Sequence, residues 1–361
     1  MKNILLITKE LIEDPKGGRE QLNKNIFRAI SCVCDKNNYE FTSYQMRTKK
    51  LSFFKKISNF FQGHIDGITP KKLLEIKNII EKDNISLVVI DGSNYGLISK
   101  FIKNKYNNIQ IISFYHNVET EFFLQKFKND FKLKSLAVLV TIYRAERLAT
   151  KFSDKRVCLN ERDSKVLYKW FGKTATHIIP LSFNIDNYGN EIKNQSHGKY
   201  LLFVGGQFFG NFEGISWFVK NVLKKIEYDL VIVGKNMDIY KHQLEISKSV
   251  KVYGEQDSLV NWYENAIVTV APIFRGSGMK TKIAESLLFG KKVVGTKEAF
   301  MGYENFLSKI GWECNSSEEF INVLNNTNLS TSNDQILILK KIFLDNFSLA
   351  AFESKVASLI D

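Results

Sequence analysis

Short apolar runs alternate along the first half of the chain with longer stretches in which apolar residues recur every three or four positions. The runs predict strands, and the longer stretches predict helices. The predicted strands are 3–8, 41–46, 86–91, 109–116, 156–160 and 176–180, and the predicted helices are 19–34, 70–82, 95–105, 133–152 and 162–171. This alternation is typical of repeated strand–helix units.

The stretch 181–199 interrupts the pattern, since it is polar, rich in Asn and Gly, and without a period, as an interdomain linker would be. Near-continuous apolar runs then follow, which are typical of strands buried on both faces of a parallel sheet. They are 199–206, 228–235, 250–254, 267–273 and 291–296, with predicted helices at 213–226, 257–266 and 280–289. The final amphipathic stretch, 334–361, predicts a helix that packs across both blocks.

Two alternating blocks of similar size predict an α/β protein with two doubly wound domains that face a cleft. We expect an N-terminal domain over 1–182, a linker over 183–198, a C-terminal domain over 199–333 and the final helix over 334–361.

The charge is unevenly distributed between these blocks. Residues 1–180 hold 32 Lys and Arg against 18 Asp and Glu, and residues 181–361 hold 19 against 20, so the first half carries the whole net charge of +13. This asymmetry favours an anionic partner for the first domain, namely nucleic acid, an acidic membrane face or a phosphorylated substrate. A lysine-rich solvated surface is the alternative.

No apolar stretch approaches the roughly 20 residues that span a bilayer, and the charged residues that interrupt the first apolar run lead us to expect no export signal. The four cysteines have neither metal-ligand spacing nor a disulfide-dense pattern, which favours a reducing cytoplasm. The five histidines are scattered, and no convincing Asp-x-Asp pair is present, so we expect no metal and no cofactor.

The stretch "RGSGMKTKIAES" (275–286) lies where a predicted strand meets a predicted helix. Gly276 and Gly278 would let the backbone approach a phosphate, and Arg275, Lys280 and Lys282 supply positive charge. Lys282 and Glu285 share one helix face, which suits a nucleoside diphosphate: the cations bind the diphosphate and the carboxylate accepts the ribose hydroxyls. The alternative is a glycine turn followed by a routine Lys–Glu surface pair.

The longer segment "VAPIFRGSGMKTKIAESLLFGKKVVGTKEAFMGYE" (270–304) resembles the C-terminal signature of glycosyltransferases of the GT-B fold, in particular family 4-like members, the glycosyl transferases group 1. "YLLFVGGQFFGNFEGISWFV", "SFYHNVETEFF", "YRAERLATKFSD" and "VCLNERDSKVLYKWFG" resemble other parts of that family. The resemblance implies two Rossmann-like domains, of which the C-terminal one binds a sugar nucleotide and the N-terminal one binds the acceptor.

The resemblance also implies roles for individual residues. Glu285 matches the glutamate that holds the ribose, and we include it with His116 as a catalytic candidate. The residues expected at the diphosphate and sugar are Gly17, Gly18, Arg275, Gly276, Ser277, Gly278, Met279, Lys280 and Lys282, and those expected at the nucleoside are Val252, Tyr253, Gly254, Asp257 and Glu285.

Two departures from the family pattern concern the donor sugar and phosphates. Ser277 stands eight residues before Glu285, where many retaining members have a second glutamate, and Gly206 and Asn211 stand where the family has Arg and Lys. We expect Arg275, Lys280 and Lys282 to supply the missing positive charge.

In the N-terminal half, Gly17 and Gly18 resemble the glycine-rich first loop of the family, although a glycine pair can also simply begin a helix. His116 ends a predicted strand, where it could donate to a sugar hydroxyl or to the leaving group. An isolated strand histidine can also be a core residue. We expect Asn160 to cap a helix, with a structural role for Asp163.

The segment "RTKKLSFFKKISNFFQGH" (47–64) combines lysines with phenylalanines at helical spacing. Such a helix can lie in a membrane interface on anionic lipid, which would suit a lipid-linked acceptor. A helix packed on the domain core is the alternative. The residues concerned are Lys49, Lys50, Phe53, Phe54, Lys55, Lys56, Phe60 and Phe61.

The sequence therefore predicts a glycosyltransferase that moves a sugar from a UDP- or GDP-linked donor to a lipid-linked or surface-polysaccharide acceptor, with retention and without a metal. We expect it in the cytoplasm, peripheral on the inner face of the cell membrane, and not bound to nucleic acid. The alternatives are a sugar-nucleotide epimerase of GT-B-like fold and a non-catalytic GT-B partner in a polysaccharide assembly complex.

Overall fold

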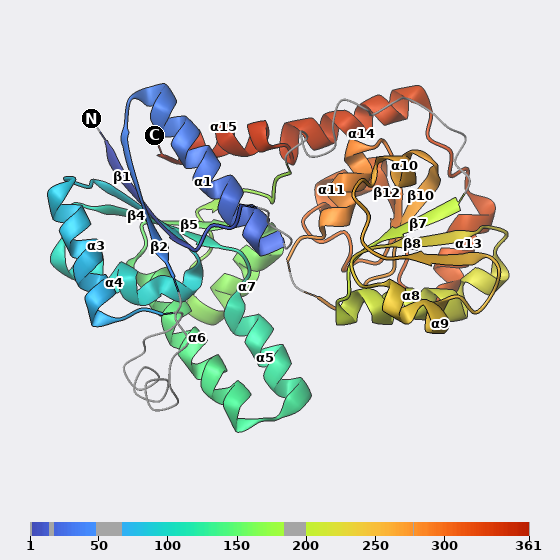
Figure 1. The fold of residues 1–361 in the computed structure, drawn as a ribbon, viewed down its shortest axis with the longest axis horizontal. Coiled ribbons are helices and arrows are strands. Elements are labelled where there is room, and N and C mark those ends of the chain that lie inside the picture. Colours follow the sequence, from blue (N-terminus) through green and yellow to red (C-terminus); the bar gives the residue numbers. More distant parts are fainter. Residues whose placement is uncertain (1, 14–17, 48–66, 184–199, 277, 361) are drawn as a thin grey trace. The chain divides into compact units, whose positions relative to one another are not determined.

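The computed structural model describes residues 2–13, 18–47, 67–183, 200–276 and 278–360 (Figure 1). Gly17, Ser277 and all eight predicted membrane-contact residues of the segment 47–64 lie outside these ranges. The chain forms two compact units, an N-terminal unit of residues 1–180 with 352–361 and a C-terminal unit of residues 181–351.

The N-terminal unit contains a six-stranded parallel sheet in the order β2-β1-β3-β4-β5-β6. The chain runs from β1 to β2 at one edge and then returns to β3 on the other side of β1, so the strand order reverses between β1 and β3. The strands are β1 Asn3–Lys9, β2 Glu40–Met46, β3 Leu87–Asp91, β4 Gln110–Tyr115, β5 Lys155–Cys158 and β6 His177–Ile178.

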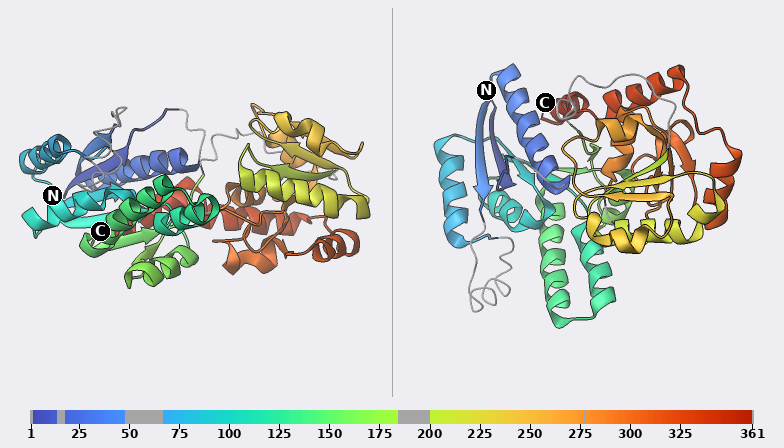
Figure 2. Two further views of the ribbon diagram at one scale, coloured as in Figure 1. Left: turned by 90° about the horizontal axis from the view of Figure 1, so that it is seen from below. Right: turned by 45° about the vertical axis from the view of Figure 1, so that its right-hand side comes forward.

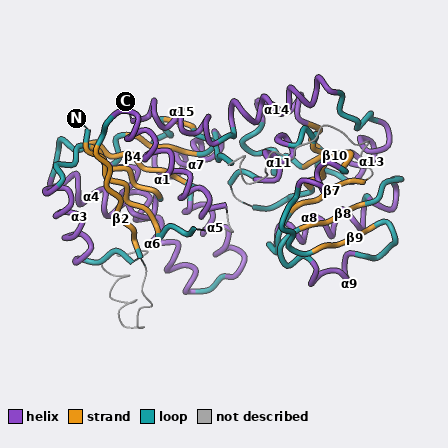
Figure 3. The backbone as a smooth tube through the Cα atoms, turned by 45° about the horizontal axis from the view of Figure 1, so that its top comes forward, coloured by secondary structure: helices purple, strands orange, loops and turns teal. Residues whose placement is uncertain are grey.

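Helices flank the strands of this sheet, as the tube in Figure 3 shows. One of them, α4, packs so closely on α6 that a Cβ at Gly96 would lie 2.0 Å from the carbonyl oxygen of Ala145. The helices are α1 Gly18–Asn37, α3 Pro70–Lys82, α4 Gly96–Lys105, α5 Glu119–Asp130, α6 Leu133–Phe152 and α7 Glu161–Phe171, and the 3-10 turn η1 spans Ser93–Tyr95. Glycine is therefore required at position 96.

The C-terminal unit repeats this architecture with a parallel sheet in the order β12-β11-β10-β7-β8-β9. Its strands are β7 Tyr200–Val204, β8 Leu230–Val233, β9 Val250–Tyr253, β10 Ala266–Ala271, β11 Val293–Gly295 and β12 Gly311–Glu313. Its helices are α8 Phe209–Asn221, α9 Lys241–Leu244, α10 Val260–Glu264, α11 Thr281–Leu288, α12 Leu307–Ile310, α13 Ser317–Asn326 and α14 Asn333–Asn346. Here the strand order reverses between β7 and β10.

The end of the chain differs from the prediction of one helix over 334–361. It forms two helices, α14 and α15 (Leu349–Ile360), because backbone groups between them form hydrogen bonds with Phe183 instead of within a helix. The N–H of Phe183 donates to the carbonyl of Phe347 (2.9 Å), and the N–H of Leu349 donates to the carbonyl of Phe183 (3.1 Å). The hydroxyl of Ser348 accepts from the N–H of Ala351 (3.1 Å) and caps the second helix.

No helix among the described residues is long and apolar enough to cross a membrane.

Candidate functional site

The loops that follow β7 and β10 leave neighbouring strands at the point where the strand order of the C-terminal sheet reverses. Ligands of doubly wound proteins bind at such a point, at the carboxyl ends of the strands. The loop after β10 includes Gly276 and Gly278, and Gly278 has a φ of 68°, which a side chain would disfavour. The glycines predicted from the sequence therefore lie at the expected edge of the sheet.

Lys282 joins the first turns of the two helices that follow these loops, α11 and α8. Its side chain is buried, and its Nζ donates to Oδ1 of Asn211 (2.8 Å) and lies 4.3 Å from the ring centroid of Phe203. Asn211 in turn donates to the carbonyl of Gly206 (2.9 Å) in the loop after β7. The amide of Asn211 is thus the hydrogen-bond partner of the lysine ammonium.

Burial lowers the pKa of Lys282 from 10.5 to about 7, and the charge of Lys280 acts in the same direction, whereas Glu285 opposes it. A bound phosphate would favour the charged ammonium, because opposite charges close together raise the pKa of a lysine. The charge of the Lys282 amine near neutral pH therefore depends on whether an anion such as a phosphate is bound beside it.

Glu285 is half-buried on α11, one turn after Lys282. The hydroxyl of Tyr263 donates to its Oε2 (3.0 Å), and the Tyr263 ring stacks on Phe289 with centroids 4.6 Å apart. This aromatic support fixes the carboxylate on the helix. No pattern in the sequence indicates Tyr263, which lies 22 residues before Glu285.

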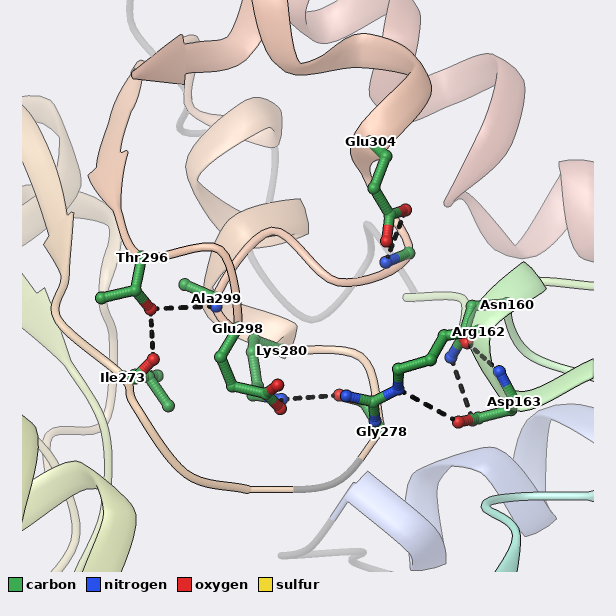
Figure 4. Close-up of polar contacts among 11 residues, drawn as sticks. Asn160, Arg162, Asp163, Ile273, Gly278, Lys280, Thr296, Glu298, Ala299 and Glu304 are labelled. Carbon is green, nitrogen blue, oxygen red and sulfur yellow. Dashed lines mark hydrogen bonds and ion pairs between the residues drawn. The ribbon is translucent and has the colours of Figure 1, made fainter. Parts of the chain in front are cut away.

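The other two cations of the loop have different surroundings. Lys280 donates to the carbonyl of Gly278 (2.8 Å) and to Oε1 of Glu298 (2.9 Å), so it joins the loop after β10 to the segment after β11 (Figure 4). Arg275 is largely exposed, and its Nε lies 3.8 Å from Oε1 of Glu213. The three cations therefore do not form one cluster of equivalent charges. Met279 is buried.

The predicted nucleoside segment comprises the last two residues of the edge strand β9 and the residues just after it. Val252 is buried, and its N–H donates to Oε1 of Glu245 (2.8 Å). The ring of Tyr253 lies 4.6 Å from that of Trp262. Gly254 packs beside the carboxylate of Asp238, and Asp257 is exposed.

His116 follows β4 at the carboxyl edge of the N-terminal sheet, and it is buried. Its Nε2 lies 2.5 Å from Oδ1 of Asp91, whose Oδ2 accepts from the hydroxyl of Thr8 (2.6 Å). Among the described residues, Nδ1 of His116 has no hydrogen-bond partner although it is buried. The carboxylate favours the tautomer with its proton on Nε2, so the neutral ring can accept a hydrogen bond at Nδ1 and donates there only when protonated.

The segment after His116 is held by a buried acid from α6. Glu146 accepts from the N–H groups of Glu119 (2.9 Å) and Thr120 (2.8 Å), from the Thr120 hydroxyl and from Ser93 (2.8 Å). Burial raises the pKa of Glu146 to about 7, and these hydrogen bonds oppose that rise. Glu146 thereby caps the start of α5, three residues beyond His116.

Gly18 begins α1, and its neighbour Gly17 lies outside the described residues. Asn160 caps α7, since its Oδ1 accepts from the N–H of Asp163 (2.8 Å) and its Nδ2 donates to the Asp163 carboxylate (3.0 Å), as Figure 4 shows. The structural role predicted for these two residues is confirmed. Within the described ranges, no three His, Cys, Asp or Glu side chains group as metal ligands would.

Residues 198–321 match the profile of the family described as Glycosyl transferases group 1. A search of curated proteins finds no match. Among solved structures, the chain is similar to sucrose-phosphate synthase from Thermosynechococcus elongatus (TM-score 0.70, 14% identity, 100% of this chain and 98% of that one). It is also similar to HepE from Anabaena in complex with UDP (0.64, 13%, 100% and 99%) and to a glycosyltransferase from Rickettsia africae (0.63, 15%, 99% and 97%). These similarities confirm the GT-B fold, and the family match confirms the predicted enzyme class.

Proposed function

Because residues 198–321 belong to the glycosyl transferases group 1, we propose that this glycosyltransferase moves a sugar from a nucleoside-diphosphate donor to a lipid-linked or surface-polysaccharide acceptor, with retention and without a metal. The observation that carries the proposal is the buried Lys282 at the reversal point of the C-terminal sheet, bonded to Asn211 and beside Glu285 on the same helix.

Negative charge develops on the diphosphate as the sugar leaves. The bond between the anomeric carbon and the diphosphate oxygen breaks, the acceptor oxygen bonds to that carbon, and the acceptor proton passes to a phosphate oxygen. A buried ammonium stabilises a developing charge more strongly than an exposed one, because water screens it less. We assign this role to Lys282, and we assign the ribose hydroxyls to Glu285.

The nucleoside is proposed to contact the segment Val252–Gly254 with Asp257, and the donor base is proposed to be uracil or guanine. HepE, whose structures contain UDP and UDP-glucose, supports a uridine donor. His116 is proposed to accept a hydrogen bond from a sugar hydroxyl at Nδ1, rather than to donate one as the sequence predicts. The segment 47–64 is proposed to hold the protein on the inner face of the cell membrane, close to a lipid-linked acceptor.

The test is release of nucleoside diphosphate by the full chain from UDP-, GDP-, ADP- and dTDP-sugars, with and without a membrane lipid extract. Release that requires the extract supports transfer, and conversion of the donor to an epimer without an acceptor would instead indicate an epimerase. No turnover of any donor would favour a non-catalytic partner. Lys282→Ala should raise the donor KM or lower kcat, whereas Lys297→Ala, at an exposed lysine of the same unit, should change neither.

A further inference from the structure

Helices α5 and α6 form a hairpin in the N-terminal unit that extends beyond its sheet (Figures 1 and 2). Its tip joins Asp130, the last residue of α5, to Leu133, the first residue of α6. The hairpin was not predicted, because only α6 has a clear helical period in the sequence.

The tip exposes large apolar side chains. Phe131 is 74% exposed and Leu133 is 84% exposed, which are the highest values among the large hydrophobic residues that the structure describes. Leu136 and Val140 continue the exposed apolar surface along α6. Single exposed apolar residues are ordinary, but a group of them at the end of a projecting element is typical of a surface that contacts something else.

The backbone conformation of Phe131 is one that a large side chain disfavours, so the fold itself does not require phenylalanine at this position. Phe131 caps α5 in the left-handed conformation, with φ 46° and ψ 28°, and its N–H donates to the carbonyl of Phe127 (2.8 Å). Glycine or asparagine is the usual residue at such a cap, and a bulky side chain there is strained. The chain therefore keeps a largely exposed aromatic ring, in edge contact with Phe127 (ring centroids 5.7 Å apart), at a position where glycine is the usual residue.

Positive charge surrounds these apolar residues. The sequence "KFKNDFKLK" (126–134) holds four lysines and one acid, Asp130. The lysine side chains are exposed, and they alternate with apolar residues around the tip: Lys126, Lys128, Lys132 and Lys134. This combination of apolar and basic side chains favours a partner whose anionic surface covers an apolar interior.

We propose that the tip of the α5–α6 hairpin docks on an anionic phospholipid surface, with Phe131 and Leu133 in the acyl boundary and the four lysines on the head groups. The inference rests on the proposed function, because it places on the protein a membrane contact that a lipid-linked acceptor requires. Two copies of the tip would bring their like charges together, so charge complementarity favours lipid over a second copy of the chain.

The experiment measures sedimentation of the full chain with phosphatidylcholine vesicles, with and without phosphatidylglycerol. We expect binding that requires phosphatidylglycerol and weakens with salt. Removing the apolar pair, Phe131→Ser with Leu133→Ser, should weaken it by about tenfold or more. Replacing the four lysines by glutamine should cost roughly fivefold for each lysine.

Matched controls lie on other surfaces of the same unit. Leu74→Ser changes an apolar residue that is 54% exposed, and a second control replaces four exposed lysines by glutamine: Lys71, Lys100, Lys165 and Lys173. Both controls should bind vesicles like the parent chain. Phe131→Gly should lose affinity while the Tm changes by less than about 2 °C, because relief of the strained cap offsets the lost ring contact with Phe127.

Equal vesicle binding by the parent chain and the tip variants would overturn the proposal, and so would equal losses in the tip and control variants. So would a parent chain that is dimeric and ignores vesicles while the tip variants are monomeric, since the partner would then be a second copy. Failure of the proposed transfer is distinguishable: vesicle binding by a chain that turns over no donor refutes the transfer and leaves the docking surface standing.

Discussion

Replacing Lys282 by methionine should stabilise the free protein while it weakens donor binding. Methionine has a similar length and no charge, and the site around the lysine is apolar on one side, where Nζ lies 4.3 Å from the Phe203 ring. If Lys282 binds a ligand but destabilises the free fold, its replacement should raise the free energy of unfolding and weaken donor binding together.

The magnitude follows from the pKa of Lys282, which burial lowers from 10.5 to about 7. A shift of that size lowers the free energy of unfolding at pH 7 by about 4 kcal/mol, compared with a protein in which the same lysine is exposed. Methionine removes this penalty but also loses the hydrogen bond to Asn211, so we expect a net gain of about 1 to 3 kcal/mol.

The sign of the pH dependence is opposite to that of a salt-bridged lysine. Between about pH 7 and pH 10.5 the unfolded chain keeps the proton of Lys282 and the folded chain has released it. The parent protein therefore gains stability from this group as the pH rises. The advantage of Lys282→Met should shrink by about 2 kcal/mol between pH 7 and pH 9.

Urea unfolding of both proteins at pH 7 and pH 9 measures these differences. Lys280→Met is the matched control, because it removes a lysine two residues away whose ammonium is paired with Glu298 (2.9 Å). That variant should lose stability at pH 7. If Lys282→Met were less stable than the parent at pH 7, with a pH-independent difference, the assignment of a buried and easily deprotonated lysine would be wrong.

Three further substitutions test other parts of the structure. Asp91→Asn should lower kcat by roughly 10- to 100-fold with little change in the nucleotide KM, because the His116 tautomer is no longer fixed; unchanged ring nitrogen shifts in ¹⁵N NMR would contradict this. Glu146→Gln should destabilise the chain by about 2 kcal/mol in urea unfolding, since the amide nitrogen cannot accept from Thr120, and an unchanged midpoint would count against the cap at α5. Gly96→Ala should cost about 3 kcal/mol by the same measurement, because the methyl group meets the Ala145 carbonyl; a smaller cost than for an exposed Gly172→Ala would refute that packing.

Much of the fold could be predicted from hydrophobic pattern alone. The strands buried on both faces are continuous apolar runs, so their positions were found within a few residues, and α3 and α6 have the predicted bounds. The very short elements α9, α12 and β12 were missed, because elements of three or four residues depend on their surroundings more than on a period. The longer helices α5 and α13 were missed as well. The break of the last helix depends on pairing with Phe183, which lies more than 160 residues earlier.

The sequence indicates which strand ends and helix starts carry the candidate residues, but it does not indicate their electrostatics. A helical wheel places Lys282 and Glu285 on one face, and only the fold shows that the loop after β7 covers the lysine. Asp91 ends an apolar strand and Glu146 lies within a long helix, and neither position by itself reveals a buried carboxylate. Burial of a charge is decided by segments far apart in the chain, so the sequence pattern cannot report it.

The length of α5 sets the distance between His116 and the hairpin tip. The helix starts three residues after His116 and ends one residue before Phe131, and its 12 residues span about 18 Å at 1.5 Å for each residue. A surface that binds the ring of Phe131 is thus connected to the imidazole of His116 through one continuous helix and not through a flexible loop. Inserting or deleting a helical turn in that helix, with a matching change in α6, would alter how far above the surface the histidine stands.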